Sequence, residues 1–434
     1  MDTINLGKVR LIIERFGMQE AEIRHGEYHV HTSKLFKHVF IQGTTNSGKT
    51  ELLKSIIQQL IKQGIRVCVI DGKGSPKFAQ DVCVMAHEAK VGPVPVFRYG
   101  TPGVSTVFHG FTGDNQSVYN RLVSLLGQED TGGPDDFYKR KRRLLLLHVC
   151  GVNIQGRYAQ IAPFEPPRSF QELAGRLTAT EWRTRFRASS EAMAVLENNI
   201  DTLEECNGLV WATVTPYIDI LGSHGFKLGD HPVSMFSINA KRGGFQSEYF
   251  IKYLTEALNE AMGNVEMVCI FDEIGMFGGE GVVGFTLGGR EFKLGMVMAL
   301  QSTASLGEKK HIEEILDTTP TKIIMKNDEA AELRRRAGTQ IETDRRKTFD
   351  KDGRSKGRSE GDREEDKISQ EDVQNLLPGE MFVVNGGSVY KVKSEMIKLK
   401  TPFHPSMQLI IHPPPQEPPQ LSSQRPKNPG PNPF

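Results

Sequence analysis

The sequence of 434 residues lacks several features, and each absence argues against a class of protein. It has no run of roughly 18 or more apolar residues and no leader that combines basic and apolar residues, so neither a transmembrane helix nor a secretory signal is predicted. We therefore expect a cytoplasmic protein, which a partner could recruit to the inner face of the membrane. The cysteines are scattered without paired spacing, which favours buried, reduced thiols over disulfides or a metal site: Cys68, Cys83, Cys150, Cys206 and Cys269.

An excess of charge of either sign is also lacking, since 54 Lys and Arg residues balance 53 Asp and Glu residues to a net charge of +1. This balance argues against binding of nucleic acid through overall charge, so any contact with DNA has to be local. Two basic clusters are candidates for such a contact, YKRKRR at 138–143 and LRRRAG at 333–338. Each of them also fits an ordinary solvated helix face.

What is present is a glycine-rich loop that fits the pattern G-x-x-x-x-G-K-[ST]. An apolar run at 39–41 precedes it, and apolar residues at helical spacing follow it, so the loop is predicted to lie between a strand and a helix. In such a loop, backbone N–H groups and the helix N-terminus bind phosphate, the lysine reaches the terminal phosphates, and the hydroxyl completes a magnesium shell. The predicted nucleotide contacts are Gly43, Thr44, Thr45, Asn46, Ser47, Gly48, Lys49 and Thr50, with Thr50 also a metal ligand.

Two adjacent carboxylates follow a second apolar strand in MVCIFDEIG, residues 267–275. Asp272 is placed to hold magnesium directly or through water, and Glu273 is placed to orient or deprotonate an attacking water. An acidic turn without function is the alternative interpretation. Together with the glycine-rich loop, however, paired carboxylates at a strand end favour hydrolysis over nucleotide binding alone.

Weaker candidates follow other segments. The strand GMVMAL ends in Gln301, which could sense the terminal phosphate, although a glutamine that caps a strand is common. Arg290 in GGREF could reach a nucleotide on a neighbouring subunit as an arginine finger, or could simply be solvated. The strand VCVID ends in Asp71, and Lys73 follows two residues later. These two residues could likewise act on a phosphate or could simply be solvated.

The order of the segments predicts an α/β sheet interrupted by a helical insertion. Strands and the glycine-rich loop occupy residues 1–114, helical patterns occupy 115–230, and strands resume in 231–405. Within the last part, 339–367 is highly charged and poor in apolar residues, which predicts a mobile loop. Residues 406–434 are rich in proline and are predicted to form a disordered tail.

With these motifs assembled, the chain resembles the FtsK/HerA superfamily of ring-shaped DNA pumps and, within it, the type IV coupling proteins of bacterial conjugation. The similarity runs in order over residues 30 to 395. It is carried by six stretches of the sequence: HVFIQGTTNSGKT, VCVIDGKG, CIFDEIG, GGREFKLGMVMALQSTASL, TKIIMKNDEAAELRRRAGT and LLPGEMFVVNGGSVYKV.

The resemblance implies a RecA-like P-loop NTPase core with an inserted all-α domain at 115–230, assembled as a homo-hexamer with ATP and Mg²⁺ between subunits. It assigns phosphate and magnesium contacts to Lys49 and Thr50, hydrolysis to Asp272 and Glu273, phosphate sensing to Gln301 and a trans-acting finger to Arg290. It does not identify which loops would grip DNA.

We therefore expect an ATP-hydrolysing ring motor that translocates DNA in conjugative transfer of a plasmid or mobile element. Two alternatives stay open: a related secretion ATPase that moves protein cargo, and a nucleotide-gated scaffold that recruits a relaxase or membrane partner. Coupling proteins usually begin with transmembrane helices, whereas the motor motifs here start almost at once. That departure suggests either an anchorless member that borrows a membrane secretion-channel partner or a different cytoplasmic role.

Overall fold

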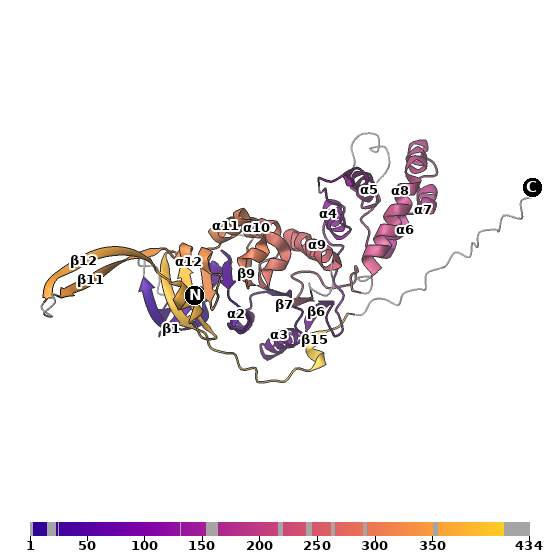
Figure 1. Ribbon diagram of the computed structural model, residues 1–434. Helices are drawn as coiled ribbons and strands as arrows, with labels where there is room; N and C mark the ends of the chain where they lie inside the picture. The colour runs from indigo at the N-terminus through magenta and orange to yellow at the C-terminus, as the bar shows by residue number, and fades with distance from the viewer. Residues whose placement is uncertain are drawn as a thin grey trace, which may run out of the picture.

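A large mixed sheet forms the centre of the protein (Figure 1). The computed structural model describes residues 3–14, 23–24, 26–130, 132–152, 164–215, 220–239, 245–261, 265–289, 293–349 and 355–411. Its thirteen-stranded sheet has the order β15-β6-β7-β5-β8-β9-β4-β10-β13-β14-β1-β3-β2. The strands are β1 (Thr3–Glu14), β2 (Ile23–Arg24), β3 (Glu27–His31), β4 (Val39–Gln42), β5 (Val67–Asp71), β6 (Val94–Tyr99), β7 (Val233–Ile238), β8 (Met267–Asp272), β9 (Leu294–Leu300), β10 (Thr321–Met325), β13 (Glu380–Asn385), β14 (Ser388–Lys393) and β15 (Gln408–Leu409).

The strands from β15 to β10 are parallel, and β13 continues the sheet in antiparallel pairing. Strands β4 to β9 of this parallel part are buried at every position, as expected for a sheet that helices cover on both faces. Because parallel strands end at one edge, the loops after β4, β5, β8 and β9 meet there. The register places Asp71 beside Asp272 and Asp272 beside Ala299.

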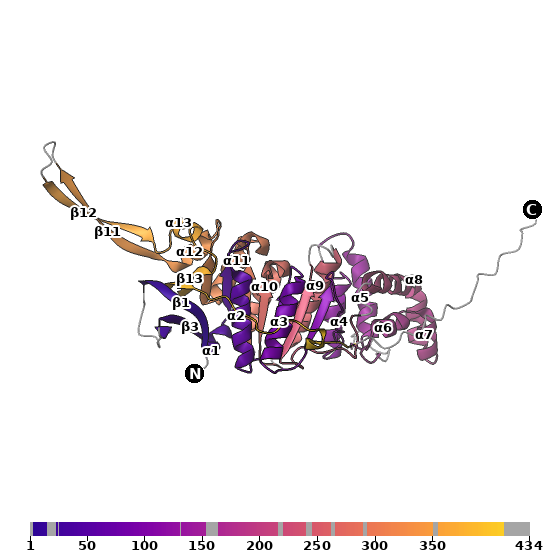
Figure 2. The same cartoon turned by 90° about the horizontal axis from the view of Figure 1, so that it is seen from below.

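Helices cover both faces of the sheet (Figures 1 and 2). On one face lie α2 (Lys49–Lys62) and α3 (Pro76–Glu88), and on the other lie α9 (Phe245–Ala261), α10 (Gly278–Gly289) and α11 (Lys309–Thr318). The predicted apolar stripe of α2 is buried against the sheet, which confirms the strand–loop–helix prediction. Shorter helices are α1 (Thr32–Leu35), η3 (Ile274–Phe277), η4 (Thr303–Leu306), α12 (Ala331–Ala337), α13 (Gln370–Gln374) and η5 (Pro405–Met407).

A group of helices stands at one end of the sheet, inserted between β6 and β7 in the sequence (Figures 1 and 2). It has its own aromatic core, in which His148 and Trp182 lie with their rings 5.3 Å apart and are almost fully buried. Buried Arg121 donates a hydrogen bond to Glu260 of α9 and so attaches the group to the core of the protein. The helices are α4 (Asn115–Leu125), α5 (Asp136–Val149), α6 (Phe170–Arg176), α7 (Ala179–Arg185) and α8 (Ser190–Val214).

The charged segment 339–367 differs from its prediction as a mobile loop. Strands β11 (Thr339–Phe349) and β12 (Ser355–Asp366) form an antiparallel hairpin that projects from the end of the protein opposite the helical group (Figure 2). The two strands pair in register from Thr339 opposite Asp366 to Phe349 opposite Ser355. The prediction from composition considered only burial of apolar side chains and left out the backbone hydrogen bonds between neighbouring strands.

Several other expectations concern the ends and the surface of the chain. Residues 405–409, partly assigned to the tail, form η5 and β15, and β15 pairs with β6 at the sheet edge. The rest of the predicted tail, 412–434, lies outside the described residues. All five cysteines are buried and free, as their spacing predicted. No helix within the described ranges is long and apolar enough to cross a membrane.

Candidate nucleotide-binding site

The glycine-rich loop leaves β4 and enters α2 at the carboxyl edge of the sheet. The N–H groups of Gly43 and Thr44 donate to Leu300 O (3.2 Å) and Lys326 O (2.8 Å), which fixes the start of the loop between β9 and β10. Gly48 has φ 102°, a left-handed conformation that glycine adopts at little cost, and it precedes the first residue of α2. The loop therefore has the strand–turn–helix setting that phosphate binding requires.

Lys49 lies almost fully buried at the start of α2, and its ammonium group is turned back onto the loop. It donates hydrogen bonds to Gly43 O and, over 2.8 Å, to Thr44 O. Burial first, and then the nearby ammonium group of Lys73, lower the pKa of Lys49 to about 8, while Asp272 and Glu273 oppose this shift. Lys49 is thus a mainly protonated cation at neutral pH in the part of the loop where phosphates would bind.

Asp272 ends β8 directly opposite the start of α2. The Thr50 hydroxyl donates to Asp272 Oδ2 over 3.3 Å, so the two predicted metal ligands lie together. Both present hard oxygen donors, which suit Mg²⁺. Within the described ranges, no group of three or more His, Cys, Asp or Glu side chains forms a metal site. At this site Mg²⁺ would be held by Thr50 and Asp272 together with phosphate and water oxygens.

Glu273 has the unusual backbone conformation φ 93°, ψ 66°, which is rare for a residue with a side chain. Its N–H donates to Ala299 O of β9 over 2.9 Å, a bond that holds the strained turn in place. Strain of this kind concentrates at functional sites, where the surrounding structure enforces it. The side chain of Glu273 is partly exposed and lies next to the predicted metal ligand.

Two lesser candidates also come to this edge. Asp71 is fully buried at the end of β5, where burial raises the pKa of its carboxyl group to about 6. Lys73 extends from the same turn and its Nζ lies 3.0 Å from Asp272 Oδ1. Lys73 thus forms an ion pair with the predicted metal ligand.

Gln301 follows β9, and its Oε1 lies 3.5 Å from Thr45 Oγ1, so the predicted sensor is next to the glycine-rich loop. Its main-chain carbonyl accepts a hydrogen bond from Asn327 Nδ2 over 2.8 Å, which fixes the turn after the strand. Arg290, the predicted arginine finger, lies outside the described residues.

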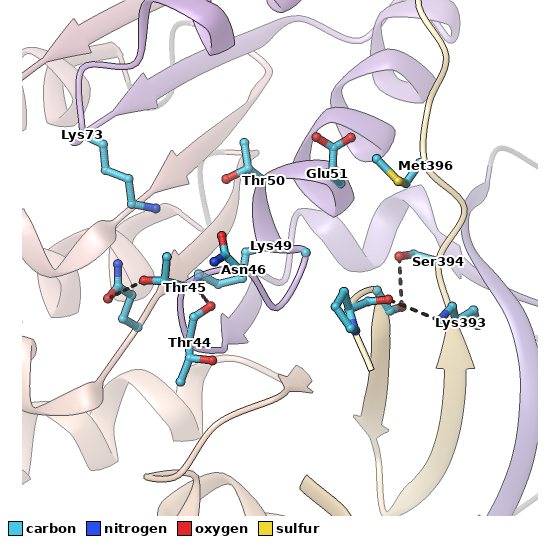
Figure 3. Close-up of a pocket in the computed structure, with 14 residues that line it drawn as sticks. Thr44, Thr45, Asn46, Lys49, Thr50, Glu51, Lys73, Lys393, Ser394 and Met396 are labelled. Carbon is cyan, nitrogen blue, oxygen red and sulfur yellow. Dashed lines mark hydrogen bonds between the residues drawn. The ribbon is translucent and has the colours of Figure 1, made fainter. Parts of the chain in front are cut away.

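A pocket of about 690 Å³ joins the glycine-rich loop, Lys73 and Gln301 (Figure 3). Its opposite wall, which sequence reasoning did not assign to the site, comes from Pro378, Gly379, Lys393, Ser394 and Met396. Gly379 N donates to Ser47 O over 2.9 Å, so this wall is bonded directly to the loop. More than 300 residues separate this wall from the glycine-rich loop in the sequence. The sheet order β4-β10-β13-β14 brings the two together.

Comparison with known proteins agrees with this geometry. The family model of the type IV secretion-system coupling protein DNA-binding domain matches residues 23–85. The unbound bacterial conjugative coupling protein TrwBdeltaN70 is 14% identical with a TM-score of 0.60, over 88% of this chain and 89% of that one. TrwB in complex with ADP and Mg²⁺ is 14% identical with a TM-score of 0.58, over 92% and 94%. No curated protein sequence matches the chain significantly.

A further similar structure is VirB4 of Thermoanaerobacter pseudethanolicus, 15% identical with a TM-score of 0.56 over 90% of this chain and 96% of that one. The fold and the loop define the class: the chain has the RecA-like P-loop NTPase fold. More particularly, it has the fold of the type IV coupling proteins, which confirms the resemblance that the motifs predicted.

Proposed function

We propose that this protein is an ATP-hydrolysing ring motor that translocates DNA, and that it works in conjugative transfer of a plasmid or mobile element. The observation that carries the proposal is the contact between the pocket and the acidic end of β8. Lys49, Thr50 and Lys73 line the pocket, the Thr50 hydroxyl donates to Asp272 Oδ2, and Lys73 Nζ lies 4.0 Å from Glu273 Oε2. A similar fold binds ADP and Mg²⁺ in TrwB, which supports the same cofactors here.

The proposed reaction is in-line attack of water on the terminal phosphate of ATP. Glu273 orients the water and accepts its proton, and the strained turn fixes the carboxylate for that task. Lys49 and the amides of the loop stabilise the negative charge that develops on the phosphate oxygens. Mg²⁺, when bound by Thr50 and Asp272, supplies further positive charge. Gln301 contacts the loop and would report whether the terminal phosphate is present.

In the proposed assembly, nucleotide lies between the subunits of a homo-hexamer and Arg290 completes the site of the neighbouring subunit. The motor core comprises 1–114 and 231–405, with 115–230 as the helical insertion. We propose that the protein works in the cytoplasm, at the inner face of the membrane through a secretion-channel partner, and that a relaxase delivers its DNA.

The experiment that tests this proposal is steady-state ATP hydrolysis by the purified chain, alone and with single-stranded or double-stranded DNA at two salt concentrations. Glu273→Gln should bind ATP yet lose turnover by about 100-fold or more, because it removes the proton acceptor. Lys49→Ala should lose both binding and turnover. Stimulation by DNA that decreases with salt supports the motor, because phosphate contacts release counterions.

Turnover that DNA does not change at either salt concentration would contradict the DNA motor and favour the alternative of protein cargo. Normal turnover in Lys49→Ala would contradict the nucleotide site itself. Multiple turnovers by the unmodified protein would exclude the nucleotide-gated scaffold.

A further inference from the structure

The side chain of Lys73 pairs with the acidic half of the candidate site. Its Nζ lies 3.0 Å from Asp272 Oδ1 and 4.0 Å from Glu273 Oε2. The other oxygen of Asp272 accepts the hydrogen bond from Thr50. Lys73 therefore engages one oxygen of the proposed magnesium ligand while the loop engages the other.

Hydrogen bonds hold the backbone of the turn that carries Lys73, whereas its side chain is partly open to solvent. The buried carboxylate of Asp71 accepts hydrogen bonds from the N–H groups of Lys73 (2.9 Å) and Ser75, which ties the backbone on both sides. Gly72 has no space for a Cβ atom, which would overlap the sulfur of Met276. The Lys73 side chain, by contrast, is 37% exposed, extends into the pocket and faces Thr50 across it (Figure 3).

Lys73 and Mg²⁺ cannot both bind closely to Asp272, because both are cations. A lysine ammonium and Mg²⁺ on one carboxylate repel each other, and like charges within about 4–6 Å shift an equilibrium strongly. Without a cation, on the other hand, the adjacent carboxylates of Asp272 and Glu273 repel. Lys73 also lies close enough to Lys49 to affect its ionisation, so its charge extends to where the terminal phosphates would lie.

We propose that Lys73 is an exchangeable cation of this site. It neutralises Asp272 and Glu273 until Mg²⁺ binds to Asp272 and Thr50, and it then moves to the terminal phosphate of the nucleotide. Lys73 would thereby discriminate ATP from ADP and release Glu273 when a complete substrate is present. This inference rests on the proposed nucleotide site.

The test compares Lys73→Met, which removes the charge but keeps most of the length, with Lys73→Arg, which keeps the charge. Lys77→Met is the matched control, because Lys77 forms a similar ion pair with Asp81 (2.9 Å) but is 79% exposed and does not line the pocket. Binding of Mn²⁺, as a probe for Mg²⁺, is measured by electron paramagnetic resonance without nucleotide. Binding of ATPγS and ADP with Mg²⁺ is measured by titration calorimetry.

In Lys73→Met we expect Mn²⁺ affinity to rise about tenfold and the preference for ATPγS over ADP to fall about tenfold, as removal of one adjacent charge implies. Lys73→Arg should keep the wild-type preference for ATPγS, and Lys77→Met should match wild type in both measurements.

The inference would be overturned if Lys73→Met had unchanged affinity for Mn²⁺, or if it lost affinity for ATPγS and ADP equally. If wild type binds neither nucleotide, the proposed site fails as well. If wild type binds both and Lys73→Met behaves identically, only the role of Lys73 is refuted.

Discussion

The glycine at the start of α2 allows a sharp test of how the two walls of the pocket are joined. Gly48 has φ 102°, and a Cβ atom placed there would lie 2.9 Å from Gly379 N and 3.2 Å from Gly379 Cα. Gly64, just beyond the other end of α2, has φ 73° with no atom within 4 Å of such a Cβ. Gly48→Ala therefore adds strain and a backbone clash, whereas Gly64→Ala adds strain alone.

The expected loss of stability has two contributions, backbone strain and a lost hydrogen bond. A left-handed alanine costs about 1–2 kcal/mol at either position. At Gly48 the clash also pushes Gly379 away from Ser47 and disrupts their 2.9 Å hydrogen bond, which adds about 1 kcal/mol. We expect Gly48→Ala to lower the free energy of unfolding by about 2–3 kcal/mol and Gly64→Ala by about 1–2 kcal/mol. Displacement of the loop should also weaken nucleotide binding at least about tenfold in Gly48→Ala alone.

Guanidinium chloride unfolding measures the free energies, and titration calorimetry with ADP and Mg²⁺ measures the affinities. If Gly48→Ala were as stable as Gly64→Ala and bound ADP as tightly as wild type, the loop and the β13–β14 wall would not be in the contact described. Equal loss of ADP affinity in both variants would also refute the reasoning, because Gly64 does not line the pocket.

Two further predictions concern the helical group. Arg121→Met should lower the free energy of unfolding by about 3 kcal/mol, because it removes the buried cation that bonds to Glu260; Arg140→Met, whose side chain is 67% exposed, should change it by less than about 0.5 kcal/mol in the same denaturant titration. His148 should destabilise the protein in acid, because burial and then the charge of Arg185 lower its pKa from 6.5 to about 4. The neutral ring is favoured in the folded state, so stability is complete above pH 6.5 and decreases by up to about 3 kcal/mol as the pH falls towards 4. His148→Phe should reduce this loss of stability in acid. Unfolding of both proteins is measured by tryptophan fluorescence at pH 7 and pH 4.5. If the pH dependence of stability were the same in the variant, His148 would not be the group responsible.

The parts of the site that lie within one short stretch of sequence were predictable from that stretch. The glycine-rich loop is specified by residues 43–50 and by the apolar patterns on either side of it. Asp272 could be placed because a buried apolar strand ends at it, and parallel strands end at a common edge. The fold class followed from the same alternation of strands and helices.

What could not be predicted depends on long-range packing. Pro378 and Gly379 belong to a stretch that carried the family resemblance, but nothing in that stretch indicated that it would line the pocket. They reach the loop through the pairing of β13 with β10. The pairing of Lys73 with Asp272 similarly depends on β5 and β8 being neighbours in space, although almost 200 residues separate them. The charged composition of 339–367 did not predict the β11–β12 hairpin, because composition carries no signal for backbone pairing between strands.

The hairpin has a mechanical consequence. Strand β11 spans 11 residues, so at about 3.4 Å per residue the arm extends roughly 37 Å. Its base is tied where Lys367 N donates to Gly338 O over 3.0 Å, and the chain then runs through α13 to Gly379, which is bonded to Ser47 of the glycine-rich loop. The base of the arm and the glycine-rich loop are thus joined through one short stretch of chain, residues 367–379, with a backbone hydrogen bond at each end.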